Sequence, residues 1–265
     1  MSYFVRNQEF AFGIDLSRYN TSADLREYPN FDQIAAHEPQ IAFVAMRTGQ
    51  SWAEKDPTFE HYFREATRIG ACILPYHVIF PGEPALKQID NLMRILGGID
   101  LTHVRLVLDV ELDHKNSRAM ITNTLVSCLE LLRQETGRYP IIYSRASFVD
   151  SHLQIEDLPW LDWWLAQYHY SRPFPAYTPE FPCPPKLPRR VTHWLIHQTT
   201  DKGPAIGGVG TYMDYDRWNG DKQDVLKYFG RTNTPVKVLC PLNSEPCCRE
   251  SQPSQPVRLA LPVEA

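Results

Sequence analysis

Short apolar segments alternate with longer amphipathic segments through the first 144 residues of this chain. The short segments are rich in β-branched and aromatic residues and are bounded by turn residues, which is typical of strands. The longer segments carry apolar residues at helical spacing. Strands that alternate with helices indicate parallel βα units. The predicted strands cover residues 12–17, 41–47, 72–80, 104–111 and 140–144, and the predicted helices cover residues 56–68, 84–97 and 117–136.

The second half of the chain follows a different pattern. Residues 162–168, 194–198 and 211–215 have the composition of strands, but the segments between them are rich in proline or glycine and show no helical spacing. Residues 171–190 contain seven prolines, and we expect them to form a long surface loop. The whole pattern predicts an α/β fold, a modified TIM-like barrel in which five βα units are followed by three β-strands.

Residues that commonly cap helices mark the ends of the predicted helices. Asp56 precedes Pro57 at the start of the helix 56–68, so we expect Asp56 to be the N-cap and Pro57 the first helical residue. Gly70 and Gly137 follow two of the helices, where glycine readily adopts the left-handed conformation that ends a helix.

Composition limits the domain organisation and the class of partner. The 265 residues suffice for one large α/β barrel, and the net charge of −4 lacks the basic surplus of a nucleic-acid binder. We expect residues 1–230 to form the barrel and residues 231–265, which are rich in proline, serine, asparagine and glutamine, to form a tail or linker. The chain shows no run of 18 apolar residues and no signal peptide, so we expect no membrane span and see no export signal.

The cysteines and histidines show no convincing metal-ligand spacing. Three cysteines are scattered through apolar segments and are interpreted as buried thiols, whereas three lie close together in the predicted tail, where a disulfide can form. His193, His197 and Asp201 do not make up a complete ligand set, so we expect no metal and no cofactor. The scattered cysteines are Cys72, Cys128 and Cys183, and the clustered ones are Cys240, Cys247 and Cys248.

A pair of acids stands inside one of the apolar strands. Asp109 and Glu111 belong to the run Leu108-Asp-Val-Glu-Leu112, where burial makes ionised side chains costly unless they serve a purpose. Two positions apart on a strand, both side chains point to the same side, with Cα atoms roughly 6.5–7 Å apart. Carboxyls that close repel when both are ionised, so one pKa should rise. A carboxyl that holds a proton beside an ionised one is what cleavage of a glycosidic bond requires.

Two further acids are predicted to join this pair. Asp15 ends the first predicted strand, and Asp214 lies in the last. The C-terminal ends of parallel barrel strands meet at one face, where active sites lie, so we expect all four acids to gather there. The alternative for any single one of them is a surface charge or a helix cap.

The motifs around these acids match one family. The acid pair lies in Leu108-Asp-Val-Glu111, an Asp-x-Glu motif. The other matching segments, in chain order around it, are Gly13-Ile-Asp-Leu-Ser17, Asp56-Pro-Thr-Phe59 with Ala66 to Gly70, Pro75-Tyr-His77, Trp164-Leu-Ala-Gln-Tyr168, His197-Gln198 and Met213-Asp-Tyr-Asp-Arg-Trp-Asn-Gly220. With these segments in the right order, the chain resembles the lysozyme-like muramidases of glycoside hydrolase family 25 from about Phe12 to Gly220.

This resemblance implies a fold, an activity and a set of residue roles. The fold is a barrel of five βα units and three further strands, and the activity is hydrolysis of the β-1,4 bond between N-acetylmuramic acid and N-acetylglucosamine in peptidoglycan. Glu111 would be the general acid/base, and Asp109 would orient the 2-acetamido group of the substrate, which can act as an internal nucleophile. The supporting acids would be Asp15 and Asp214, and the tyrosines that line the sugar subsites would be Tyr76, Tyr143 and Tyr168.

Three other polar residues are candidates for substrate binding. Gln198 lies in the matching His197-Gln198 segment. His77 ends a predicted strand and could hydrogen-bond a substrate or a carboxylate, although a core histidine with satisfied nitrogens fits the pattern as well. Arg47 stands where a strand would carry an apolar residue and could pair with an acid in the cleft, the alternative being a solvated cation.

The chain departs from the family pattern at several places. Trp194 stands three residues before His197, where the family often has tryptophan next to the glutamine, and Asp216 replaces the usual asparagine. The segments 80–84 and 171–190 differ from the family's loops and would border the cleft. Two alternatives to a muramidase therefore stay open, a glycan-binding protein without catalysis and a hydrolase of another N-acetylated glycan such as chitin. For a muramidase we expect a monomer that binds peptidoglycan or a related polysaccharide and acts outside the cell or at the cell wall.

Overall fold

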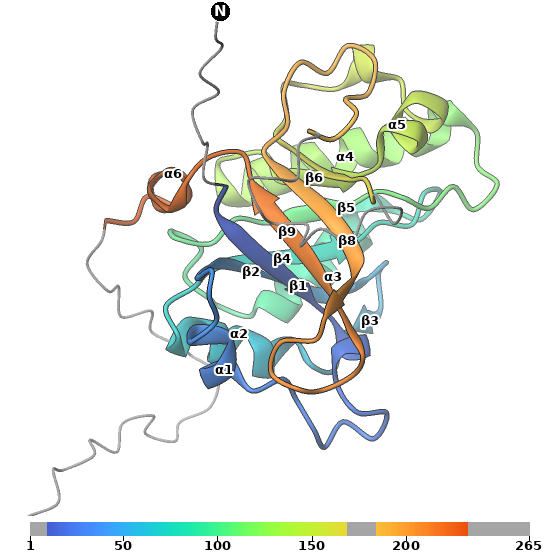
Figure 1. Ribbon diagram of the computed structural model, residues 1–265. Helices are drawn as coiled ribbons and strands as arrows, with labels where there is room; N and C mark the ends of the chain where they lie inside the picture. The colour runs from blue at the N-terminus through green and yellow to red at the C-terminus, as the bar shows by residue number, and fades with distance from the viewer. Residues whose placement is uncertain (1–9, 169–183, 233–265) are drawn as a thin grey trace, which may run out of the picture.

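A closed barrel of eight strands forms the centre of the computed structural model, which describes residues 10–168 and 184–232 (Figure 1). The strands follow the order β1-β9-β8-β7-β6-β5-β4-β2, and β2 pairs with β1 to close the ring, while the short β3 pairs only with β2. The barrel strands are β1 (Phe12–Leu16), β2 (Ile41–Gln50), β4 (Cys72–Val78), β5 (Val107–Asp109), β6 (Ile141–Ser144), β7 (Trp163–Ala166), β8 (Ile196–Pro204) and β9 (Tyr212–Trp218), and β3 covers Glu54–Lys55.

The strand directions confirm the predicted topology. From β1 to β8 every sequential pair of barrel strands is parallel, and the crossovers after β1, β2, β4, β5 and β6 each contain a helix. The connections from β7 to β8 and from β8 to β9 contain no helix within the described residues. β9 is antiparallel to both of its neighbours, β8 and β1. The barrel thus consists of five βα units followed by three strands.

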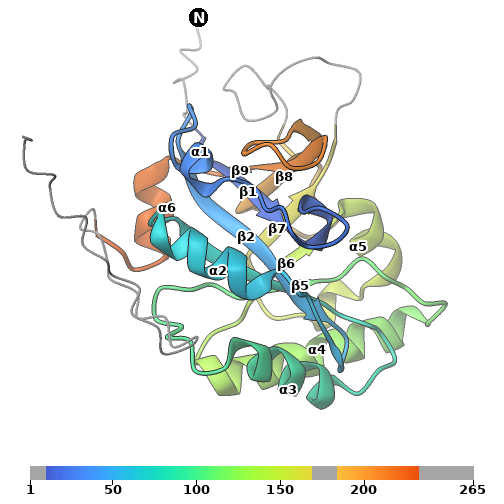
Figure 2. The same cartoon turned by 90° about the horizontal axis from the view of Figure 1, so that it is seen from below.

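The helices lie outside the barrel, with α2, α3 and α4 covering one side (Figure 2). Three helices, α1, α5 and α6, have no counterpart in the sequence prediction, because they are short or follow the last strand. No helix in the described part of the chain is long and apolar enough to cross a membrane. The helices are α1 (Phe31–Ala35), α2 (Phe59–Arg68), α3 (Ala85–Leu96), α4 (Arg118–Thr136), α5 (Ala146–His152) and α6 (Lys222–Tyr228), with 3-10 turns at Arg18–Asn20 and Ile155–Asp157.

Alternation along the strands divides the apolar core in two. Outward-facing residues such as Ile14 of β1 and Leu108 of β5 pack with helix residues such as Phe63 of α2, forming the larger cluster. The residues that alternate with these along each strand point inward and fill the half of the barrel interior away from the C-terminal mouth. This inner cluster includes Phe43, Leu74, Val107, Ile141, Trp164, Ile196 and Trp218, one from nearly every strand.

The start of α2 differs from the prediction. The helix begins at Phe59 with Thr58 as its N-cap, so Asp56 is not the cap. The Asp56 carboxylate instead accepts hydrogen bonds from the backbone N–H of Thr58 at 2.9 Å and from its hydroxyl at 2.6 Å. The predicted helix ends are confirmed, because Gly70 follows α2 with a φ of 75° and Gly137 caps α4 with a φ of 73°.

The predicted domain boundary at residue 230 stays a prediction, because the described part of the chain ends at Thr232. Arg231, the first residue of the predicted tail, still donates a hydrogen bond to the backbone oxygen of Ala71 at 2.9 Å. Cys72 and Cys128 are buried free thiols, as predicted. Residues 233–265, Cys183 and most of the predicted loop 171–190 lie outside the described residues, so the tail and the pairing of Cys240, Cys247 and Cys248 stay predictions.

Candidate active site

Along the barrel strands, the residues that face the interior change from apolar to polar toward the C-terminal mouth of the barrel. Val107 of β5 is followed two residues later by Asp109, and Ile141 of β6 by Tyr143. In β8, Ile196 is likewise followed by Gln198. Strand periodicity of two therefore carries the polar residues to the same opening. They line a cavity of about 280 Å³ bordered by Asp15, Ser17, Tyr19, Arg47, Gln50, Tyr76, Val78, Asp109, Glu111, Leu112, Tyr143, Trp164, Gln198 and Asp214.

Asp109 and Glu111 both border this cavity, but they differ in burial. β5 ends at Asp109, so Glu111 lies just beyond the strand rather than within it, which corrects the predicted strand end. Asp109 is 5% exposed, and its Oδ1 is buried with no hydrogen-bond partner among the described residues. Burial raises the pKa of Asp109 well above the ordinary aspartate value, and the charges of Glu111 and Asp15 raise it further.

Glu111 is the more accessible acid of the pair. Its side chain is partly exposed and borders both the central cavity and a second cavity beside it. Burial raises the pKa of Glu111, while the positive charge of Arg145 opposes the rise. A partly exposed carboxyl with a raised pKa, next to a buried acid, keeps its proton to a higher pH than an ordinary glutamate and can deliver it to a bound ligand.

Asp15 and Asp214 lie opposite each other on paired strands. Asp15 of β1 and Asp214 of β9 are partners in the register of the two strands. Because β9 runs antiparallel to β1, the N-terminal half of β9 lies at the mouth of the barrel. Gln198 of β8 links them, since its Nε2 donates to Asp15 Oδ2 at 2.7 Å and to Asp214 Oδ2 at 3.2 Å. Burial raises the pKa of Asp15 to about 6. Burial, with the charge of Asp15 next in importance, raises the pKa of Asp214 to about 9.

Two of the three tyrosines hydrogen-bond the same glutamine, and the third packs in the barrel interior. The hydroxyls of Tyr143 and Tyr168 both donate to Gln198 Oε1, the former at 2.8 Å. Tyr76 packs edge-on against the Trp164 ring with centroids 6.2 Å apart. Tyr76 and Tyr143 border the central cavity, and Tyr143 and Tyr168 border the second one. The structure therefore brings all three tyrosines together around the acids, and their contacts with a sugar stay a prediction.

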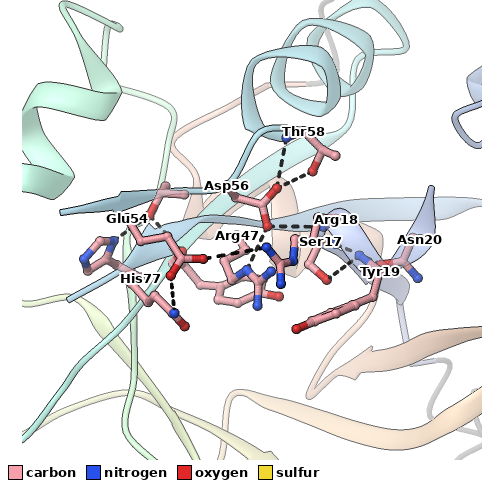
Figure 3. Close-up of polar contacts among 12 residues, drawn as sticks. Ser17, Arg18, Tyr19, Asn20, Arg47, Glu54, Asp56, Thr58 and His77 are labelled. Carbon is pink, nitrogen blue, oxygen red and sulfur yellow. Dashed lines mark hydrogen bonds and ion pairs between the residues drawn. The ribbon is translucent and has the colours of Figure 1, made fainter. Parts of the chain in front are cut away.

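Arg47 borders the cavity and forms an ion pair, but its partner is Asp56 and not one of the four acids above. Arg47 Nε lies 2.8 Å from Asp56 Oδ2, and the Asp56 carboxylate is fully buried. Figure 3 shows Asp56 facing Arg47, Thr58 and Arg18 at once. The guanidinium also lies over the ring of Tyr19, 5.1 Å from its centroid. The ion pair thus holds Arg47 beside the mouth.

His77 is not at the site, which corrects its candidacy as a substrate-binding residue. Its side chain is fully buried, with Nε2 2.8 Å from the backbone oxygen of Ser51 and Nδ1 2.9 Å from the Thr48 hydroxyl. Burial lowers the pKa of His77 to about 4. Tyr76 faces the cavity, and its neighbour on the strand consequently faces away from it. His77 is a neutral histidine of the core.

Asp216 is a buried acid of the site, although the sequence indicated it only as a departure from the family's usual asparagine. It is fully buried in β9, and its Oδ1 accepts a hydrogen bond from Trp164 Nε1 at 2.8 Å. The spacing of two between Asp214 and Asp216 is the signal that could have identified it, because both side chains must then face the barrel interior.

Two aromatic residues of the site were also missed. Trp164 borders the central cavity, although the sequence showed it only as part of a family motif. Tyr19 borders the cavity as well and is 71% exposed, so its ring is available for stacking at the rim. No local pattern singled out Tyr19, which lies in a 3-10 turn after β1.

A second cavity of about 340 Å³ adjoins the first at Glu111 and Tyr143. Two cations border it, Arg145 directly after β6 and Lys186 on the segment before β8. Both side chains are exposed, and neither forms an ion pair with an acid in the described ranges. This part of the cleft is suited to an anionic group of a ligand.

The histidines once weighed as metal ligands have protein partners. His193 stacks on Trp160 with ring centroids 4.6 Å apart, and its Nε2 lies 3.5 Å from Asp162 Oδ1. His197 Nε2 lies 2.9 Å from the backbone oxygen of Gln167. Within residues 10–168 and 184–232, no group of three or more His, Cys, Asp or Glu side chains is placed to hold a metal ion.

Comparison with solved structures shows the same fold in several enzymes. A muramidase from Acremonium alcalophilum superposes with a TM-score of 0.66 at 19% identity, covering 83% of this chain and 98% of that one. A family 25 glycosyl hydrolase from Bacillus anthracis gives a TM-score of 0.65 at 18% identity, covering 83% and 93%. The bacterial lysozyme from Streptomyces coelicolor gives 0.64 at 19% identity, covering 82% and 95%.

Comparison of sequences identifies both a relative and the family. The uncharacterized protein YegX of Escherichia coli K12 is 25% identical over 228 residues, which make up 84% of this chain and 75% of YegX. The profile described as Glycosyl hydrolases family 25 matches residues 14–208, a span that contains Asp15, Asp109, Glu111 and Gln198. This chain belongs to family 25 of the glycosyl hydrolases and is a glycoside hydrolase.

Proposed function

We propose that this protein is a 1,4-β-N-acetylmuramidase, a lysozyme that cleaves the bond between N-acetylmuramic acid and N-acetylglucosamine in peptidoglycan. The observation that carries the proposal is the partly exposed carboxyl of Glu111, whose pKa is raised by burial, beside the buried Asp109 in a barrel-mouth cavity. The muramidase and lysozyme among the structures of the same fold support it. The protein would accordingly act on the cell wall.

The two carboxyls are suited to different parts of the reaction. Glu111 would donate its proton to the glycosidic oxygen as the bond from that oxygen to the anomeric carbon breaks. The acetamido oxygen of the same sugar, oriented by Asp109, would bond to the anomeric carbon and form a cyclic intermediate. Water would then attack that carbon and open the ring, with its proton passing to Glu111. The cycle leaves Glu111 protonated, as at the start.

The second cavity favours peptidoglycan over a neutral glycan. Arg145 and Lys186 border it within reach of a ligand that contacts Glu111. The muramic acid of peptidoglycan carries a lactyl group with an acidic peptide attached, whereas chitin carries no charge. Cations beside the cleavage point would contribute to binding only for a substrate that presents anions there. The two cations therefore favour a muramidase over an enzyme that cleaves chitin.

The test is digestion of purified peptidoglycan by the wild type and by Glu111→Gln. The wild type should clear the suspension and release muropeptides that end in N-acetylmuramic acid at the reducing end. Glu111→Gln should lower the rate by about 10²- to 10⁴-fold, the usual contribution of a general acid. Glu135→Gln, an exposed acid on α4, is the matched control and should behave as the wild type.

The other outcomes distinguish the alternatives. Binding of peptidoglycan without release of reducing ends would identify a glycan-binding protein and contradict the proposal. Cleavage of chitin oligosaccharides but not of peptidoglycan, followed by mass spectrometry, would identify the other hydrolase. The double variant Arg145→Gln/Lys186→Gln should raise KM for soluble peptidoglycan fragments several-fold and leave KM for a neutral N-acetylglucosamine oligomer unchanged.

A further inference from the structure

Asp216 lies one layer deeper in the barrel than the acids that border the cavity. In β9 it stands between Asp214 at the mouth and Trp218 in the inner apolar cluster. Its side chain is fully buried, and Oδ1 accepts a hydrogen bond from Trp164 Nε1 at 2.8 Å. Its Oδ2 is also buried, yet no donor among the described residues reaches that oxygen. An ionised Asp216 would therefore have a hydrogen-bond partner on only one of its two carboxylate oxygens.

The groups that surround Asp216 carry either no charge or a negative one. Asp15 of β1 lies within hydrogen-bond reach, and Asp214 lies on the same strand. Trp164 of β7 and Gln198 of β8, its register partner, are neutral. Gln198 Nε2 has two hydrogens, and they are given to Asp15 and Asp214. Arg47, the cation of the cavity, is already paired with Asp56.

An ionised carboxylate in these surroundings would be strongly disfavoured. A buried charge without a counter-ion is strongly unfavourable, and a neighbouring carboxylate adds repulsion. Burial and the charges of Asp15 and Asp214 raise the pKa of Asp216 well above the ordinary value for an aspartate. A proton on Oδ2 removes the charge and supplies the missing hydrogen bond, because the resulting O–H can donate to Asp15.

We propose that Asp216 stays protonated and donates a hydrogen bond from Oδ2 to Asp15, so that Asp15 is the ionised member of this pair. Asp15 then accepts from both Asp216 and Gln198 Nε2, which sets the orientation of the Gln198 amide. That orientation turns Gln198 Oε1 toward the hydroxyls of Tyr143 and Tyr168. Asp216 is thus a positioning residue that acts on the sugar-binding tyrosines through Asp15 and Gln198.

If Asp216 has this role, an asparagine should be able to replace it. An asparagine at this position can accept from Trp164 through Oδ1 and donate to Asp15 through Nδ2, reproducing both contacts of a protonated aspartate. A leucine of similar volume can make neither contact. If Asp216 were an ionised acceptor, asparagine would instead present an amide hydrogen where a negative charge had been and would disturb the site as leucine does.

The first arm of the test measures activity and rests on the proposed function. On peptidoglycan at neutral pH, Asp216→Asn should keep kcat/KM within about threefold of the wild type, while Asp216→Leu should lose about 10- to 100-fold, as expected when a hydrogen bond to a charged group is lost. Loss of activity in Asp216→Asn as severe as in Asp216→Leu, with both variants folded, would overturn the inference.

The second arm does not depend on activity. The infrared difference spectrum of wild type minus Asp216→Asn at neutral pH should contain the carbonyl band of a protonated carboxylic acid. A carboxylate band in its place would overturn the inference even if the enzyme is active. If peptidoglycan is not cleaved at all, the muramidase proposal fails, and the spectrum still decides the protonation of Asp216.

Discussion

Arg47 and Asp56 form a nearly buried ion pair at the edge of the barrel mouth, with Arg47 Nε 2.8 Å from Asp56 Oδ2. The arginine side chain is 14% exposed and the aspartate side chain is not exposed at all. Asp56 also accepts hydrogen bonds from the backbone N–H groups of Arg18 and Thr58 and from the Thr58 hydroxyl. One carboxylate therefore joins β2, the turn after β1 and the start of α2 beside the cavity.

Removal of this carboxylate should destabilise the fold. Asp56→Ala leaves the Arg47 guanidinium without its partner and frees three further donors, so we expect the free energy of unfolding to fall by about 3–5 kcal/mol. Urea denaturation followed by circular dichroism measures the loss. Glu156→Ala, which breaks the exposed pair between Glu156 and Arg190, is the control and should cost less than about 1 kcal/mol. Equal losses in the two variants would contradict a structural role for Asp56.

Gln198 should affect catalysis more than stability, because it links two acids and two tyrosines around the cavity. Gln198→Leu removes the donors to Asp15 and Asp214 and the acceptor of Tyr143 and Tyr168. We expect kcat/KM to fall by about 10- to 100-fold, the effect of one or two lost hydrogen bonds to charged or reacting groups. Steady-state kinetics would show it, with the exposed Gln223→Leu on α6 as control. Unchanged kinetics in Gln198→Leu would exclude this linking role.

Asp214 should make the protein less stable as the pH rises. Its pKa is raised by burial from 3.8 to about 9, so the folded protein holds the proton more tightly than the unfolded chain between these values. The free energy of unfolding should therefore decrease with rising pH through this window. Asp214→Asn should flatten the decrease, measured as the thermal midpoint at several pH values. The exposed Asp90→Asn should keep the slope of the wild type, and a wild-type slope in Asp214→Asn would disprove the assignment.

Arg145 should set the pH range in which Glu111 can act as an acid. Burial raises the pKa of Glu111 and the charge of Arg145 lowers it, so Arg145→Gln should raise that pKa further. A general acid must be protonated, and the alkaline limb of kcat/KM should consequently move to higher pH. Arg133→Gln, which removes an exposed charge on α4, should leave the limb in place. A limb that does not move in Arg145→Gln would show that another group controls it.

Much of the fold could be predicted because it depends on local patterns. Short apolar segments rich in β-branched and aromatic residues mark strands such as β2 and β4, helical spacing marks α2 to α4, and the order of these elements leaves few topologies. Periodicity of two also explains why Asp109 and Tyr143 lie inside the barrel, beyond the apolar residues Val107 and Ile141. The short helices α1 and α5 were missed because so few residues carry too little pattern.

Residues whose partners lie far along the chain were harder to interpret. The sequence indicated that Arg47 could pair with an acid, but the choice of Asp56 depends on how the segment after β3 turns back toward β2. His77 looked like a site residue, although its position next to the inward-facing Tyr76 already indicated the opposite side of the sheet. Glu111 was assigned to the strand, while the pairing of β5 ends at Asp109.

The sequence by itself determined the class of fold, the family and the set of acids at the barrel mouth, because these follow from periodicity and from short motifs. Only the tertiary structure decided which acids share a hydrogen-bond donor and which lie close to one another. The hydrogen bond from Gln198 to Asp15 joins residues 183 positions apart, and Asp216 meets Asp15 only after β9 closes the barrel against β1. Protonation depends on burial and on neighbouring charges, and both exist only once distant strands have come together.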